Sequence, residues 1–121
     1  MTYFTKEHEY IRVDGDTGVC GISNFAQSEL GEIIKVILPE NGKTIKKGDE
    51  ICYVESPKES SKVYAPVSGK IVEINSSLED SPELINEDPY GKGWIYKVKL
   101  SDATELKALM VEADYEKYIQ G

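Results

Sequence analysis

The chain has 121 residues and a mass of 13.5 kDa, which suits one compact domain and is too short for two. Hydrophobic residues make up 40% of it and charged residues 30%, a composition that argues against disorder. The net charge is −8, with Arg12 as the single arginine, and this sign repels nucleic acid phosphates and anionic lipid. We therefore expect one domain over residues 1–121 that binds neither nucleic acid nor a membrane.

No apolar run approaches the roughly 18 residues of a membrane span, and the N-terminus lacks the apolar core of a signal peptide. We expect the unprocessed chain to stay in the cytosol. An acidic surface suits basic grooves on protein partners, but it can also serve solubility alone, and both interpretations stay open.

Motifs of catalysis and metal binding are missing from the sequence. The one histidine, His8, has no zinc-site spacing around it, and no nucleophile elbow, Walker loop or dinucleotide-binding glycine motif occurs. Cys20 and Cys52 lie inside apolar runs, where we expect buried free thiols rather than a disulfide or a metal pair. An autonomous enzyme is not expected, so any reactive group has to come from outside the twenty side chains.

A hydrophobic period of two dominates the chain and predicts β-strands. Residues 10–14 and 18–22, joined by Asp14-Gly15-Asp16, predict an opening hairpin. Many short strands at this spacing indicate a sandwich or a barrel. Further apolar runs, rich in β-branched residues and bounded by turn residues, lie at 33–38, 51–54, 63–67, 70–74 and 94–100.

Helices are expected to be few and short. One is predicted at residues 25–30, capped by Asn24, with Gln27 completing a capping box and Gly31 ending the helix. Shorter turns are predicted after Ser81-Pro82, after Asp102 and from Asp114, the last with Tyr115, Tyr118 and Ile119 facing inward.

Residues 42–56 and residues from Ala65 onward each run turn, strand, turn, strand, and the tight turn Pro57-Lys58-Glu59 joins them. This symmetry predicts that the turn lies at the tip of a two-fold sandwich. Because the fixed φ of proline suits the second position of a type I or II turn, Lys58 would project from a rigid tip. Most exposed lysines have no function, so the turn alone assigns none.

Six segments of the chain, one of which includes Lys58, match a known family in order and spacing: His8-Glu9, Gly21–Ile33, Leu38–Glu50, Val54–Lys58, Tyr64–Asn75 and Ser81–Trp94. In their order and spacing the chain resembles the H protein of the glycine cleavage system, a lipoyl carrier of the lipoyl and biotinyl carrier superfamily. The likeness covers nearly all 121 residues. It implies a mainly β fold, a barrel-sandwich hybrid of two sheets with a few short helices.

The resemblance implies that Lys58 carries lipoate in amide linkage, on an arm that extends on the order of 15 Å. It also implies that a lipoylating enzyme reads Gly42, Glu55 and Gly69, and that Glu9 helps to neutralise the amine of the loaded arm. The dithiolane would supply the chemistry, and the protein delivery and shielding.

The implied partners are the decarboxylating glycine dehydrogenase, the aminomethyltransferase and dihydrolipoyl dehydrogenase, besides the lipoylating enzyme. The arm would accept a methylamine group from the first, present it to the second and be reoxidised by the third. We expect a non-catalytic carrier and a monomer, because a shuttle must free its surface for successive partners.

The chain departs from the family pattern near the lysine, where the usual sequence reads approximately ESVKAxSD. Pro57 replaces a small apolar residue, Glu59 replaces an alanine, and Lys62 stands where an aspartate of the aminomethyl-arm site is expected. A cation there would repel an amine by roughly 1 kcal/mol at about 4 Å in an exposed site. Tyr10 also replaces the more usual tryptophan.

Three interpretations of function therefore stay open. The first is the H protein of the glycine cleavage system. The second, motivated by Lys62 and the altered turn, is an H-like lipoyl carrier of another system, such as lipoate relay or oxidation of sulfur compounds. The third is an interaction domain that keeps the fold but carries no lipoate. Biotin is not expected, because no Met-Lys-Met signature occurs.

Overall fold

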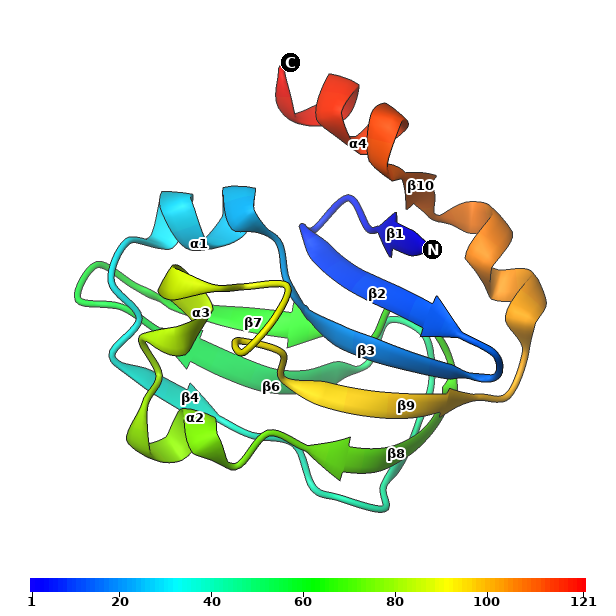
Figure 1. Ribbon diagram of the computed structural model, residues 1–121, viewed down its shortest axis with the longest axis horizontal. Coiled ribbons are helices and arrows are strands. Elements are labelled where there is room, and N and C mark those ends of the chain that lie inside the picture. Colours follow the sequence, from blue (N-terminus) through cyan, green and yellow to red (C-terminus); the bar gives the residue numbers. More distant parts are fainter.

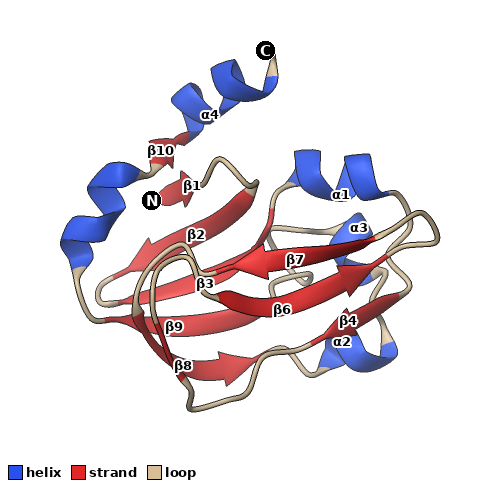
Figure 2. Ribbon diagram, turned by 180° about the vertical axis from the view of Figure 1, so that it is seen from behind, coloured by secondary structure: helices blue, strands red, loops and turns tan.

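The computed structural model describes the whole chain, residues 1–121, as two antiparallel sheets joined by short helices and loops (Figures 1 and 2). The predicted mainly β fold of two sheets with a few short helices is confirmed. The strands are β1 (Thr2–Phe4), β2 (Glu9–Asp14), β3 (Thr17–Ile22), β4 (Lys35–Ile37), β5 (Thr44–Ile45), β6 (Glu50–Glu55), β7 (Ser60–Tyr64), β8 (Gly69–Ile74), β9 (Tyr96–Leu100) and β10 (Met110–Val111).

The larger sheet has the strand order β10-β1-β2-β3-β9-β8-β5, and the smaller sheet has the order β4-β6-β7. The predicted opening hairpin is β2 and β3, which pair from Glu9↔Ile22 to Asp14↔Thr17. Two short strands, β1 and β10, have no counterpart in the sequence prediction, because two or three residues are too few to show a period of two. Strand β5 is the first strand predicted within residues 42–56.

The middle of the chain is symmetric about the predicted turn, but the second unit starts at β7, before Ala65 where it was predicted to start, and β8 is followed by α2 instead of another strand. Strand β6 pairs with β7 directly across the turn at residues 56–59, and β5 pairs with β8 outside them. These two nested pairs belong to different sheets, so the chain crosses between sheets on each side of the hairpin. Residues 56–59 therefore lie at the far tip of the smaller sheet, at the left of Figure 1.

The helices are α1 (Asn24–Leu30), α2 (Ser77–Asp80), α3 (Leu84–Glu87), the 3₁₀ helix η1 (Ala103–Ala108) and α4 (Glu112–Ile119). The predicted cap of α1 was wrong by one residue. Ser23, in an extended conformation, accepts the N–H of Ala26 on its hydroxyl at 3.1 Å. Asn24 is already helical, and its side chain accepts from the side chain of Gln27 instead.

The later helical turns follow their predicted caps in part. Asp102 caps η1 by accepting the N–H of Thr104, as expected. In α4, Tyr115 is buried, but Tyr118 is 43% exposed, so the prediction that it faces inward was wrong. Its hydroxyl donates to the carbonyl of Lys6 at 3.0 Å, which holds the ring at the surface.

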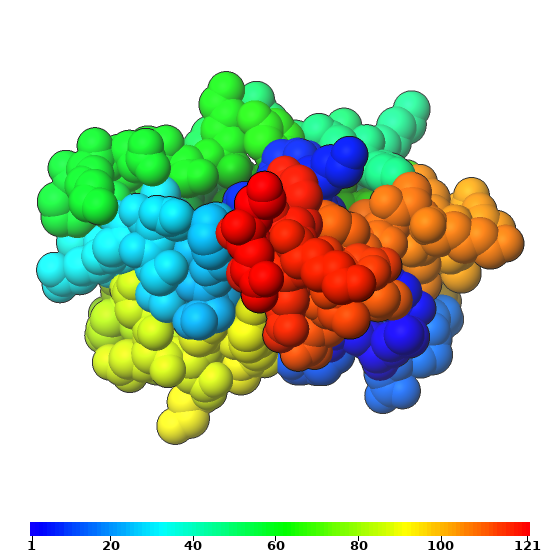
Figure 3. Space-filling model, turned by 90° about the horizontal axis from the view of Figure 1, so that it is seen from above, coloured from blue at the N-terminus to red at the C-terminus, as the bar shows by residue number.

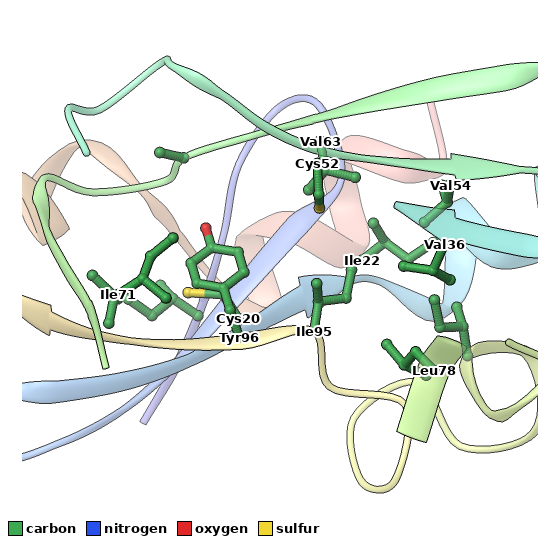
Figure 4. Packing of buried hydrophobic residues seen from close by; sticks show 14 of the residues in the cluster. Cys20, Ile22, Val36, Cys52, Val54, Val63, Ile71, Leu78, Ile95 and Tyr96 are labelled. Carbon is green, nitrogen blue, oxygen red and sulfur yellow. The ribbon is translucent and has the colours of Figure 1, made fainter. Parts of the chain in front are cut away.

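One hydrophobic core fills the space between the two sheets (Figure 4). Residues such as Cys52 and Val63 from the smaller sheet face Cys20 and Tyr96 from the larger one. Both cysteines are buried free thiols, as predicted. No helix of the structure combines the length and the apolar character needed to cross a bilayer.

Candidate functional site: the Lys58 hairpin and the Glu9 cavity

Lys58 lies in the four-residue connection between β6 and β7, and its side chain is exposed. Across this connection the N–H of Ser56 donates to the carbonyl of Glu59 at 2.9 Å. The N–H of Glu59 in turn donates to the hydroxyl of Ser56 at 3.3 Å. The side chain of the buried Ser56 thus takes the place of the backbone acceptor that a type I or II turn would use.

Several contacts fix this tip on the rest of the molecule. The carbonyl of Glu55, the last residue of β6, accepts the N–H of Ile34 at 2.8 Å. The stem of Lys58 passes Gly31, where an added methyl group would lie 4.0 Å from its Cε. Pro57 restricts the backbone directly before the lysine. Lys58 is therefore an exposed amine on a rigid mount.

Of the three residues expected to guide lipoylation, only Glu55 lies near Lys58, three residues away at the end of β6. Gly69 pairs with Ile45 and Leu100 in the larger sheet, so it stands on a different sheet from the hairpin. Gly42 precedes β5, and its N–H donates to Ile71 of the neighbouring β8. The structure does not bring these two glycines to the tip.

Backbone geometry gives both glycines a structural role. A Cβ on Gly69 would lie 2.1 Å from the carbonyl oxygen of Lys99, which is shorter than any contact the packing can accept. Gly42 has φ +87°, a conformation that favours glycine. Both positions thus need glycine for the fold itself.

Glu9 is the one acidic residue of the chain that is buried, with 3% of its surface exposed. Its Oε1 accepts from the hydroxyl of Thr5 at 2.5 Å, and its Oε2 accepts from the N–H of Tyr64 at 3.2 Å. Burial, opposed by these hydrogen bonds, raises the pKa of Glu9 to about 7. The carboxyl therefore joins β2 to the end of β7 and is about half protonated at neutral pH.

Glu9 lines a cavity of about 580 Å³. Four parts of the chain build its walls: the N-terminal segment, the loop between β5 and β6, the end of β7 with the residues after it, and the segment before α4. The walls include Phe4, Thr5, Lys47, Tyr64, Pro66, Leu109 and Met110. The cavity thus combines apolar side chains and the charged Lys6, Glu7 and Lys47 with one buried, titratable carboxyl group. Tyr64 links it directly to the strand that starts beside Lys58.

His8 precedes Glu9 but is used for packing. Its Nδ1 lies 2.8 Å from the hydroxyl of Tyr115, which also lies 2.7 Å from the hydroxyl of Ser23. Its ring packs against Phe25, and burial lowers its pKa. His8 therefore connects α4 to the start of α1 and takes no part in the cavity.

Lys62 is the main departure from the family pattern, and the structure gives it a partner. Its Nζ lies 3.2 Å from Oε1 of Glu50 across the hairpin, and this neighbour raises the pKa of Lys62. Glu50 is bound also by the hydroxyl of Tyr53. The cation of Lys62 is thus matched by a local anion, which weakens the repulsion that we expected it to exert on an amine.

Sequence reasoning missed the residues that assemble the cavity. Thr5 and Tyr64 hold Glu9. Thr5 lies outside the matching segments and Tyr64 was given no role in them, and the two are brought together only when β2 meets the end of β7. The pairing of Glu50 with Lys62 depends on a bulge between Glu50 and Cys52, which shifts the register of the hairpin. No sequence signal marks this bulge.

A model of one protein family, described as "Glycine cleavage H-protein", matches residues 2–121 of the chain. The chain belongs to this family. Two relatives named "Glycine cleavage system H protein" agree with it along almost their whole length. The protein of Beijerinckia indica is 50% identical over 99% of this chain and 97% of its own, and that of Xanthobacter autotrophicus is 53% identical over 96% and 93%.

A solved member of the H-protein family has the same architecture. The crystal structure of a glycine cleavage system H protein from Mycobacterium marinum matches with a TM-score of 0.90 and 35% sequence identity. The match covers 99% of this chain and 97% of that one. The hairpin, the cavity and the C-terminal segment therefore all lie within the part of the chain that the family shares.

Proposed function

We propose that this chain is the lipoyl carrier of the glycine cleavage system and that Lys58 is the residue that carries lipoate. The observation that supports this most is the position of Lys58, an exposed amine on a rigid hairpin, in a chain that the H-protein family matches from residue 2 to residue 121. The carrier moves the aminomethyl group of glycine between enzymes and performs no chemistry with its own side chains.

The site fits a lipoyl arm in reach and in shape. Tyr64, at the cavity, follows Lys58 by six residues, so their Cα atoms lie at most about 20 Å apart at roughly 3.3 Å per residue. An arm on the order of 15 Å that lies along β7 covers most of this distance toward the cavity. A lipoyl group on Lys58 supplies the disulfide that accepts and releases the cargo.

Glu9 is proposed to hold the amine of the loaded arm. A buried carboxylate that faces an ammonium forms a charge-assisted hydrogen bond, and the dry surroundings strengthen it. Thr5 and Tyr64 fix the carboxyl group in place, and the cavity walls shield the cargo from water. The side chains of the carrier thereby position and protect the group without reacting with it.

The partners follow from this function. They are the decarboxylating glycine dehydrogenase, the aminomethyltransferase, dihydrolipoyl dehydrogenase and an enzyme that attaches lipoate. Glu55 is proposed to be read directly by the attaching enzyme, because it lies beside the lysine. Gly42 and Gly69 are proposed to act on lipoylation through the fold, because they lie in and beside the other sheet.

A lipoyl carrier of another system is the second interpretation, and no observation favours it. It was motivated by Lys62 and the altered turn, and the charge of Lys62 is balanced by Glu50 in the structure. The relatives at about 50% identity are all named for the glycine cleavage system.

Lipoylation of Lys58 is tested by intact mass spectrometry of the protein produced in cells that contain lipoate. The wild-type protein should gain one lipoyl mass increment, and the Lys58→Arg variant should not. Lys62→Arg is the matched control, because it changes a lysine of the same hairpin and keeps a cation beside Glu50. A wild-type chain without the increment, or an increment that persists in Lys58→Arg, would contradict the assignment.

A further inference from the structure

The smaller sheet ends in an open strand edge beside Lys58. Its order, β4-β6-β7, leaves both β4 and β7 with a strand neighbour on one side only. Strand β4 packs against α2, whereas β7 starts two residues after Lys58. In the view from above, residues of this hairpin, in green, lie at the surface beside α1, in cyan (Figure 3). An edge of this kind is a template for an added strand.

The register identifies which backbone groups of β7 point to the open edge. Ser56 bonds to Glu59 across the turn, and in an antiparallel ladder every second residue repeats that orientation. Ser61 and Val63, which pair with Val54 and Cys52, therefore face β6. The alternate residues of β7, which are Ser60, Lys62 and Tyr64, therefore face outward.

Tyr64 supports this assignment, since its N–H leaves the sheet and donates to Glu9 at 3.2 Å. Glu9 thus closes the edge at its far end. Ser60 and Lys62 lie closer to the tip, and the side chain of Lys62 is turned across the hairpin to Glu50, away from the edge. Their outward N–H and C=O groups have no protein partner there.

The position of this edge beside Lys58 indicates which enzyme would bind to it. An enzyme that attaches lipoate works at Nζ of Lys58, about 6 Å from the Cα of that residue, and must hold the backbone beside it. An enzyme that acts on the end of the arm works on the order of 15 Å away and has no such need.

We propose that the enzyme that lipoylates Lys58 adds an extended segment to the edge of β7 and pairs with the backbone of Ser60 and Lys62. The proposal rests on the proposed function, in which Lys58 carries lipoate. Peptide recognition by strand addition draws its affinity from main-chain hydrogen bonds. Such bonds depend little on side chains, so this mode of binding would tolerate Glu59 and Lys62, which depart from the family pattern.

The test compares two substitutions of one residue. Lys62→Pro removes an outward N–H and no bond of the β6–β7 ladder, whereas Lys62→Thr removes the side chain and keeps the N–H. Each purified, unmodified variant is incubated with a lipoate protein ligase, lipoate and ATP, and intact mass is followed over time. We expect Lys62→Thr within about twofold of wild type and Lys62→Pro at least tenfold slower, with both variants folded by circular dichroism.

A folded Lys62→Pro variant that is lipoylated at the wild-type rate would overturn the proposal while the proposed function stands. A wild-type protein that the ligase leaves unmodified would instead remove the proposed function. The two failures are therefore distinct.

Amide hydrogen exchange of the wild-type protein, measured by NMR, keeps the proposal testable if Lys62→Pro does not fold. In the free protein, the amides of Ser60 and Lys62 should exchange fast and those of Ser61 and Val63 slowly. Addition of the ligase should protect Ser60 and Lys62. No gain of protection with the ligase, or a gain only with the aminomethyltransferase, would overturn the proposal.

Discussion

Among single residues, Glu9 has a charge state that depends on its burial. Its carboxyl accepts two hydrogen bonds, yet its pKa rises to about 7, because burial disfavours the anion more strongly than the bonds favour it. The free carrier therefore holds this acid near the midpoint of its titration at neutral pH. Capture of an ammonium would favour the anion, so loading of the arm is expected to release a fraction of a proton.

The stability of the fold should depend on the titration of Glu9. Because the folded pKa lies above the unfolded value of 4.5, the folded state binds more protons between these values, and stability falls as pH rises from about 4.5 to about 7. The full effect is about 3 kcal/mol, at about 1.36 kcal/mol per pH unit. The difference in free energy of unfolding between wild type and Glu9→Gln, from urea denaturation, should change by this amount between pH 4 and pH 8. A constant difference would contradict the account.

Two buried tyrosines of the larger sheet provide a matched pair. The hydroxyl of Tyr96 has no oxygen or nitrogen partner in the core and only the thiol of Cys20, a weak hydrogen-bonding group, beside it, whereas that of Tyr10 donates to the carbonyl of Pro89 at 2.7 Å. Removing an unsatisfied buried hydroxyl relieves its desolvation penalty, and removing a bonded one leaves an orphaned acceptor. We expect Tyr96→Phe to raise the free energy of unfolding by about 1 kcal/mol and Tyr10→Phe to lower it by about 1 kcal/mol. Urea denaturation measures both, and destabilisation by Tyr96→Phe would show that its hydroxyl has a partner.

Among the elements, α4 is attached to the sheet mainly through its tyrosines. Tyr115 is buried, stacks on Phe4 with ring centroids 4.2 Å apart, and bonds to His8 and Ser23. Strand β10, directly before α4, pairs with β1, and its Met110 lines the Glu9 cavity. The attachment of α4 therefore also holds one wall of the cavity.

Loss of the Tyr115 hydroxyl should loosen this helix. Tyr115→Phe removes two hydrogen bonds and leaves His8 and Ser23 short of a partner, so it should lower the free energy of unfolding by about 1–3 kcal/mol. Tyr118→Phe is the control, since its exposed hydroxyl makes one bond to the Lys6 carbonyl, and we expect less than about 0.5 kcal/mol. Equal effects of the two substitutions in urea denaturation would refute this role of Tyr115.

The elements also show which parts of the fold can be predicted from the sequence. Alternation in residues 10–22 and 94–100 and the turn at Pro57-Lys58-Glu59 predicted the hairpins and the tip correctly, because periods and turn residues are local signals. The short strands β1 and β10 exist only because they pair with each other and with β2, and no local pattern encodes such pairing. The cap at Ser23 was missed because Asn24 is an equally good capping residue by type, and only the backbone conformation decides between them.

For the whole molecule, the residues of the site could be predicted from the sequence, but their arrangement in space could not. Lys58 and Glu9 were predicted from a family resemblance, which the match over residues 2–121 supports. Their relation in space was not predictable, because the cavity is built from four parts of the chain that lie far apart in the sequence. The net charge of −8 suits a carrier that must bind several enzymes in turn, because attraction to a basic surface raises the rate of association. Salt screens this attraction and should lower that rate.

The central claim is that Lys58 bears the arm that takes the aminomethyl group from glycine. It is tested most directly by the exchange of labelled bicarbonate into the carboxyl group of glycine, catalysed by the decarboxylating glycine dehydrogenase. The fully lipoylated wild-type chain should stimulate this exchange strongly, and the unlipoylated chain and Lys58→Arg should not. A folded chain that carries lipoate on Lys58, shown by intact mass, and yet fails to stimulate the exchange would contradict the account.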